Sequence, residues 1–235
     1  QALLLAEIAV GRGLHDDGKR RERIRALIDA CDGIVSSTHS ALLRQYALEA
    51  LDWAAMVGDL EPAELLRIVR VCEQVIGRRR QFPPRTLLRA LLSVAKSPAL
   101  DIGTGEALIR TLARMMESDH WSDNPDPRLP LFVDANALIA TVAKRISSDD
   151  GASASFMRGA RNLITGSRGI DGPSSARWVL LRMMAGILPH VSAEDVLGEA
   201  LAAAEFCAGL AWDPGAVLAT ADLLISLAEG ASEAQ

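Results

Sequence analysis

The sequence predicts an all-α fold, and three observations lead to that prediction. Alanine, leucine and arginine, which favour helices, are abundant, whereas aromatic residues make up only 4% of the chain. Apolar residues recur at spacings of three and four along most of the chain, and no stretch alternates convincingly with a period of two. A short apolar pattern that ends in alanine also recurs along the chain, which is typical of stacked helical repeats.

The periodicity predicts the following helices in chain order: 2–12, 19–31, 38–57, 62–78, 85–97, 104–117, 131–147, 153–165, 174–188, 193–208 and 214–229. Hydroxyl groups that can accept a first-turn hydrogen bond mark several starts, at Ser37 or Thr38, Thr104, Ser174 and Ser192. Proline follows an acid at two further starts, Glu61-Pro62 and Asp213-Pro214. Glycine falls just past four predicted ends, at Gly33, Gly77, Gly166 and Gly230. Two longer loops are expected at 118–130 and 166–173.

The recurring pattern consists of two apolar residues, three others and an alanine. Its alanines lie 46, 40, 48, 42 and 43 residues apart, at Ala9, Ala55, Ala95, Ala143, Ala185 and Ala228. Each copy falls on the first helix of an expected pair, where the small alanine lets a neighbouring helix approach closely. The pattern predicts a right-handed α-solenoid of about five to six helix pairs with a period of about 40–48 residues, which forms a single domain over residues 1–235.

Arginine recurs on the second helix of each expected pair. We call this set the arginine ladder: Arg23, Arg25, Arg67, Arg70, Arg110, Arg114, Arg158 and Arg161. The first members are separated by 44, 43 and 48 residues and the second members by 45, 44 and 47. Arginines three or four residues apart share one helix face, so the repetition stacks them along one surface. The last second helix, 193–208, breaks the ladder because it contains acids and no arginine.

The arginine ladder has two interpretations. As a binding surface, it would contact RNA or another polyanion. As a solvated face, it would pair with acids three or four residues further on, Arg25 with Asp29, Arg70 with Glu73 and Arg114 with Glu117. The densest basic stretch, at Arg78, Arg79 and Arg80, would either touch phosphate or an acidic peptide, or only favour the end of its helix.

This organisation resembles HEAT and armadillo-type repeats over nearly the whole chain. The resemblance implies a docking module that binds a partner along a curved surface lined by the second helices. The chain lacks the proline and the Asp/Arg set that HEAT units carry at fixed places.

Residues 87–98, LLRALLSVAKSP, and 135–145, ANALIATVAKR, carry a second resemblance. They are similar to the helical repeats of bacterial effectors named after Ser-Lys-Trp-Pro, and to the octotricopeptide-type repeats of organellar RNA-binding proteins. The match rests on Ser93, Lys96, Pro98 and Lys144, and the tryptophan is missing. For an effector, the resemblance implies a location in the host cytosol.

Other motifs give weaker hypotheses. Residues 101–107, DIGTGEA, resemble the first motif of Rossmann-like methyltransferases, but no strand is predicted on either side, so we interpret them as a turn in which Thr104 caps a helix. The four histidines form no paired metal motif. Three scattered cysteines, Cys31, Cys72 and Cys207, are expected to be buried thiols in a reducing compartment.

Composition limits the remaining function classes. The 235 residues are 49% hydrophobic and 23% charged, and no apolar run approaches the ~18 residues that a membrane span needs. The opening QALLLAEIAV has no basic leader and no initiator methionine, so we expect a segment of a longer protein rather than a secretion signal. Residues 1–100 carry 15 basic and 12 acidic side chains and residues 101–235 carry 10 and 18, so the two ends favour different partners.

We therefore expect a cytoplasmic, non-enzymatic interaction module without a cofactor, a metal or a catalytic residue, which binds a protein or peptide along its concave face. RNA or another polyanion, bound through the arginine ladder, is the alternative partner. A methyltransferase-like enzyme is the third hypothesis.

Overall fold

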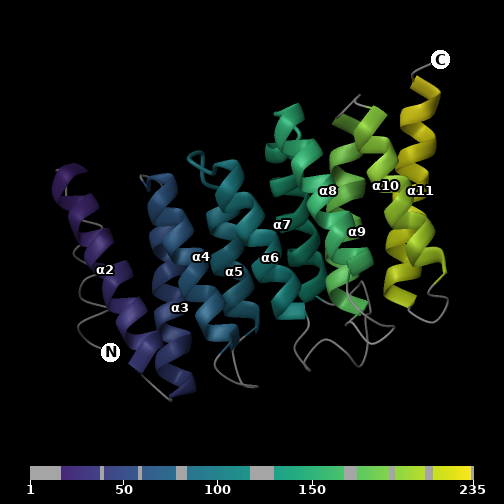
Figure 1. Ribbon diagram of the computed structural model, residues 1–235. Coiled ribbons are helices and arrows are strands. Elements are labelled where there is room, and N and C mark those ends of the chain that lie inside the picture. Colours follow the sequence, from purple (N-terminus) through teal and green to yellow (C-terminus); the bar gives the residue numbers. More distant parts are fainter. Residues whose placement is uncertain are drawn as a thin grey trace. The chain divides into compact units, whose positions relative to one another are not determined.

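The structure, a computed structural model, describes residues 17–37, 40–57, 60–77, 84–116, 130–166, 174–190, 194–209 and 214–233 (Figure 1). Its α-helices are α2 (Asp17–Ser37), α3 (Ala41–Met56), α4 (Pro62–Gly77), α5 (Pro84–Ala95), α6 (Ile102–Met116), α7 (Pro130–Ile146), α8 (Asp150–Gly166), α9 (Ser174–Ile187), α10 (Glu194–Ala208) and α11 (Pro214–Glu233), with a 3₁₀ turn η1 (Leu188–His190) after α9. The described residues contain no strand, which confirms the all-α fold. None of their helices is both long enough and apolar enough to cross a membrane.

The predicted helix ranges agree with these elements except at particular ends. Helix α2 continues to Ser37 although Gly33 was expected to end it, because Val35 in its last turns is fully buried in the core. Burial of that side chain outweighs the ~1 kcal/mol that a glycine costs inside a helix. Gly230 likewise lies inside α11, whereas Gly77 and Gly166 are the last residues of their helices. The predicted helix 2–12 lies outside the described residues.

Two helix caps also differ from the prediction. Helix α3 is capped by Ser40, whose hydroxyl accepts a hydrogen bond from the backbone N–H of Leu43 at 3.4 Å, and not by Ser37 or Thr38. Helix α6 begins at Ile102, where Asp101 accepts a hydrogen bond from the backbone N–H of Thr104 at 2.8 Å. Thr104 is therefore a buried residue of the first turn and does not cap the helix.

The chain divides into two compact units, residues Gln1–Thr111 and Leu112–Gln235, and each is described by itself. In the first unit, α3 packs against α2 and α5, and α2 packs against α4. In the second unit, α9 packs against both α7 and α11, and α8 packs against α10. Within each unit, alternate helices of the chain therefore lie side by side (Figure 1).

The recurring apolar pattern forms much of each core. Its buried members are Ala50, Leu51, Ala55, Ala90, Leu91, Ala95, Leu138, Ile139, Ala143, Leu180 and Leu181. The last copy differs, because Leu223 is buried but Leu224 remains 45% exposed. Helices α7 and α9 approach so closely that a Cβ added at Gly186 would lie 2.9 Å from the Cβ of Ala143. Ala143, the alanine of the recurring pattern on α7, thus lies where a neighbouring helix approaches closely, as the pattern predicts.

Candidate functional site

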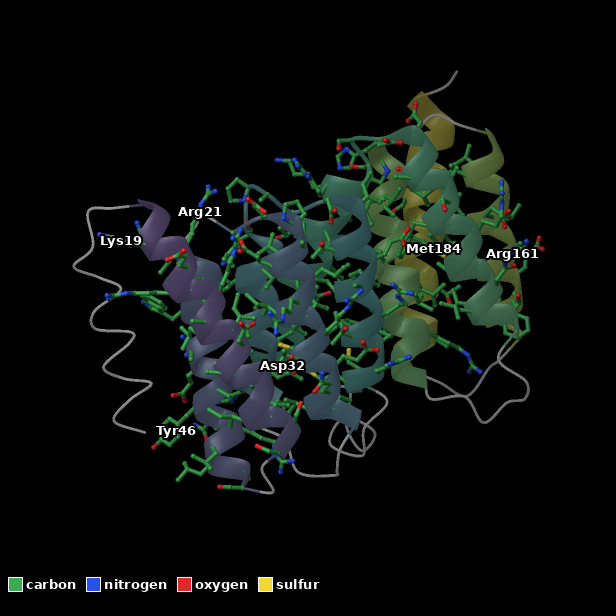
Figure 2. All side chains as sticks on the ribbon, turned by 60° about the vertical axis from the view of Figure 1, so that its left-hand side comes forward. Lys19, Arg21, Asp32, Tyr46, Arg161 and Met184 are labelled. Atoms are coloured by element: carbon green, nitrogen blue, oxygen red, sulfur yellow. The ribbon has the colours of Figure 1, made fainter. Side chains whose placement is uncertain are left out.

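The arginine ladder lies on the four helices that were expected to carry it. Its members occupy α2, α4, α6 and α8 in pairs, and all are exposed except Arg161, which is partly buried. Arg78, Arg79 and Arg80 lie outside the described residues. Figure 2 shows Arg161 of α8, and Arg21 of α2, which lies two residues before Arg23, projecting from the surfaces of their helices.

In the first unit, the ladder arginines pair with acids across helices α2 and α4. Arg25 of α2 donates from Nε to Glu64, and its Nη2 lies 3.6 Å from Oε2 of Glu61. Arg67 of α4 pairs in the opposite direction with Asp29, and its Nη2 lies 3.6 Å from Oδ2 of Asp32. We call this set, Arg25, Asp29, Asp32, Glu61, Glu64 and Arg67, the α2–α4 charge network.

This arrangement differs from the ion pairing within each helix that the sequence predicted. Asp29 was expected to pair with Arg25 on its own helix, yet it pairs with Arg67 on the neighbouring one. The hydrogen bond and the charge of Glu64 raise the pKa of Arg25, so that guanidinium stays charged. Because both arginines face carboxylates, much of their positive charge is compensated within the protein itself.

The second unit repeats this arrangement between α8 and α10. Nε of Arg161 donates to Oε2 of Glu199 at 2.6 Å, and Nε of Arg158 lies 3.7 Å from Oε1 of the same residue. Helix α10, which carries no arginine, therefore supplies the acid that its neighbour needs. Where the ladder ends, on α10, Glu199 therefore lies opposite Arg158 and Arg161 of α8.

Three ladder arginines remain available to a ligand. Arg23, Arg70 and Arg110 are exposed, and within the described part of the chain none of them forms an ion pair. They lie on three different helices, α2, α4 and α6. The expected pair of Arg70 with Glu73 is absent there, and Glu117, the expected partner of Arg114, lies outside the described residues.

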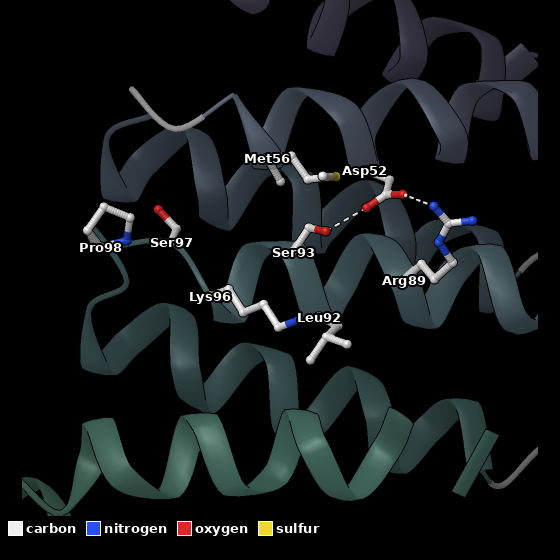
Figure 3. A pocket seen from close by; sticks show the side chains of 9 residues that line it. Asp52, Met56, Arg89, Leu92, Ser93, Lys96, Ser97 and Pro98 are labelled. Carbon is white, nitrogen blue, oxygen red and sulfur yellow. Dashed lines mark hydrogen bonds and ion pairs between the residues drawn. The ribbon is translucent and has the colours of Figure 1, made fainter. Parts of the chain in front are cut away.

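Helices α3 and α5 enclose an open pocket of about 380 Å³ that the sequence did not predict (Figure 3). The buried carboxylate of Asp52 accepts a hydrogen bond from Oγ of Ser93 at 2.6 Å and forms an ion pair with Arg89, whose Nη2 lies 3.2 Å from Oδ2. Lys96 extends along the same wall, and Met56, 69% exposed, lines the apolar side. Lys96, Met56 and the serines that line the pocket offer binding contacts. The carboxylate of Asp52 is engaged by Ser93 and Arg89 and so joins α3 to α5.

Part of this pocket was visible in the sequence. Ser93, Lys96 and Pro98 carried the resemblance to effector-type repeats, and all three line the pocket. Asp52 was missed, although it is the single acid in the otherwise apolar stretch 50–55, which is a signal that could have identified it.

The remaining motifs do not assemble into a reaction site. Gly103 and Gly105 lie in the first turn of α6, where they follow a capping aspartate and not a strand. Within the described ranges, no three His, Cys, Asp or Glu side chains come together as a metal site. The three cysteines are buried and form no disulfide, and burial, with smaller contributions from Cys31 and Asp52, raises the pKa of the Cys72 thiol to about 12. That thiol is therefore protonated at neutral pH and is a poor nucleophile.

Comparison with known proteins identifies no relative: no family model, no curated protein and no solved structure matches the chain.

Replacement of Glu64 by alanine is expected to lower the free energy of unfolding by about 1–2 kcal/mol. The side chain is nearly buried, accepts the backbone N–H of Glu61 at 2.8 Å at the start of α4, and holds Arg25. Urea unfolding followed by circular dichroism measures the change. Glu61→Ala removes the same charge from a more exposed position and should cost less than about 0.5 kcal/mol. Equal effects of the two substitutions would contradict this role of Glu64.

Proposed function

We propose that the chain is a helical-repeat module of the α-solenoid type, which binds a protein partner along the surface of its second helices. The packing of alternate helices within each unit supports this proposal. In a solenoid, each helix pair contacts the next pair, so equivalent helices lie side by side. In this chain, α2 packs against α4, α3 against α5, and α8 against α10, and α9 packs against both α7 and α11. These contacts are the ones expected of such a stack.

The polar contacts between these helices are the observation that carries the proposal. Side-chain hydrogen bonds join residues 39 apart at Arg25–Glu64, 41 apart at Ser93–Asp52, 38 apart at Arg161–Glu199 and 46 apart at Arg182–Asn136. Their spacing resembles that of the recurring alanines. A chain of unrelated helices would not be expected to repeat one spacing in contacts from both units.

The charge of the second helices favours a protein over a polyanion. The α2–α4 charge network presents acids and bases side by side, and Glu199 compensates Arg158 and Arg161 in the second unit. A protein surface of mixed charge can complement such an arrangement. A phosphate backbone would be attracted by the arginines and repelled by their neighbouring acids. RNA binding through Arg23, Arg70 and Arg110 remains the alternative, since these exposed arginines have no described ion-pair partner.

A photo-reactive amino acid placed at Arg70 of α4 tests the proposal. After nuclease treatment of an extract from the source cells, we expect adducts with a small set of proteins that unlabelled chain competes away. The matched control carries the same group at Glu49, which is exposed on the first helix α3. Adducts that are equal at both positions would contradict binding along the second helices.

A second experiment tests the RNA alternative directly. Fluorescence anisotropy with a single-stranded RNA of about twenty nucleotides is measured between about 50 and 200 mM salt. The alternative predicts tight binding that weakens steeply with salt and is lost when Arg70 and Arg110 are both changed to alanine. Such a result, without any protein adduct at position 70, would replace the protein partner with RNA.

A further inference from the structure

The pocket between α3 and α5 has a charged side and an apolar side, and all of its lining belongs to the first unit. Arg89, Ser93 and Lys96 lie three and four residues apart, so they share one face of α5 and of the turn that follows it. The apolar lining consists of Ala55, Met56, Leu92 and Pro98. A ligand with one polar end and one apolar end matches this division.

Lys96 extends toward the charged side of the pocket. Its backbone N–H donates to the carbonyl of Leu92 at 3.1 Å, so the residue continues the last turn of α5. A side chain in such a turn leans back over the residues three and four positions earlier, which here are Ser93 and Leu92. Figure 3 shows the Lys96 side chain extending toward Leu92 and away from Pro98. The ammonium group is therefore held on the face that Arg89 and Ser93 share.

The lining has an excess of positive charge. Arg89 and Lys96 carry two positive charges and Asp52 carries one negative charge, which leaves one positive charge uncompensated. Asp52 is paired with Arg89, whereas Lys96 forms no ion pair within the described part of the chain. A monoanion would neutralise this excess. A dianion such as a phosphate monoester would leave a negative charge close to the buried Asp52, so a carboxylate is the better match.

The apolar side supplies contact area and sets the size of the ligand. Met56 is 69% exposed and Leu92 is partly exposed, so a ligand that covers them removes apolar surface from water. The volume of about 380 Å³ lies within the range of small-molecule sites. It corresponds to about a dozen water molecules at about 30 Å³ each, which is room for about ten non-hydrogen atoms. This volume favours a small molecule over a helix.

We propose that the pocket between α3 and α5 binds a small aliphatic monocarboxylate, whose carboxylate contacts Lys96 and whose chain covers Met56 and Leu92. Only Nη2 of Arg89 faces Asp52, so the other nitrogens of this guanidinium can donate to the same carboxylate. The pocket lies on two first helices. The proposal therefore does not depend on the second-helix surface of the proposed function.

The proposal is tested with sodium octanoate, an aliphatic carboxylate of this size, titrated at neutral pH into the isotope-labelled whole chain. We expect saturable changes in the amide resonances of α3 and α5, with a dissociation constant of about 0.1–1 mM. Acetate lacks the chain and octylammonium carries the opposite charge. Neither should shift these resonances at the same concentration.

Lys96→Gln should weaken octanoate binding about fivefold or more, because a charge-assisted hydrogen bond is lost. The matched control is Lys144→Gln, since Lys144 follows the patterned alanine of α7 as Lys96 follows that of α5, is exposed and lies outside the pocket. It should change the affinity less than about twofold. Met56→Glu places an acid on the apolar side and should weaken binding at least about tenfold. All three variants should keep the parent unfolding midpoint, because the replaced side chains are exposed.

Three results would each overturn the proposal: no saturable change with octanoate, an equal change with acetate or octylammonium, or an unchanged affinity of Lys96→Gln. A short peptide that ends in leucine tests the other source of an aliphatic carboxylate, beside the same peptide with an amidated end. If the free-ended peptide binds more tightly than octanoate and the amidated one does not bind, the pocket receives the C-terminus of a protein and the small-molecule ligand is wrong.

Discussion

Replacement of Gly186 by valine is expected to lower the free energy of unfolding by about 2–3 kcal/mol, the largest effect of any single substitution proposed for this chain. A Cβ at this position would lie 2.9 Å from the Cβ of Ala143, which cannot rotate away because it is fixed to the backbone of α7. Valine adds two further methyl groups, so α7 and α9 must separate and lose contact along their length. Urea unfolding followed by circular dichroism measures the loss.

A matched substitution and a rescue separate this contact from the general properties of glycine. Gly198 lies on α10, and a Cβ there would meet no atom within 4 Å, so Gly198→Val should be neutral or stabilising through helix propensity. Combining Gly186→Ala with Ala143→Gly moves the methyl group from one helix to the other. The double variant should be more stable than the sum of its single substitutions predicts. An additive result would show that the two residues do not define the distance between the helices.

The helices themselves could be predicted from the sequence because their signals are local. Pro62 and Pro214 begin helices where they were expected to, and the apolar spacing extends over nearly every observed element. Gly33 was misinterpreted because glycine is a common end signal, while the burial of Val35 that carries α2 past it depends on neighbouring helices. The cap of α6 was placed at Thr104 instead of Asp101, since both residues can accept the same kind of first-turn hydrogen bond.

The candidate site could be predicted only in part, because its contacts are not local. The periodic spacing placed the arginine ladder on the correct helices, yet it could not identify Glu64 as the partner of Arg25 or Asp29 as the partner of Arg67. Local pairing rules extend only three or four residues, whereas these partners lie on a neighbouring helix, 39 and 38 residues away along the chain. Exposed ion pairs of this kind contribute little stability one by one.

Cys72 is expected to make the stability of the protein fall as the pH rises from about 9 to about 12, and to leave it unaffected below that range. Burial, the largest cause, raises the pKa of this thiol from its ordinary value near 9 to about 12 in the folded chain. Between these two values the unfolded chain has lost the proton that the folded chain still binds. Raising the pH therefore favours unfolding, by at most about 1.4 kcal/mol for each pH unit.

The difference between the parent and Cys72→Ala isolates this effect from the other groups that titrate at high pH. Both proteins are unfolded with urea at several pH values from 7 to 11, and the free energies of unfolding are subtracted. We expect a constant difference up to about pH 9 and a shrinking one above it, because only the parent has a buried thiol to ionise. Val75→Ala removes a buried side chain of similar size from the same helix and should differ from the parent by the same amount at every pH. A pH-independent difference for Cys72→Ala would show that the thiol reaches water in the folded chain, in which case it should also react with a thiol reagent at pH 8 without unfolding.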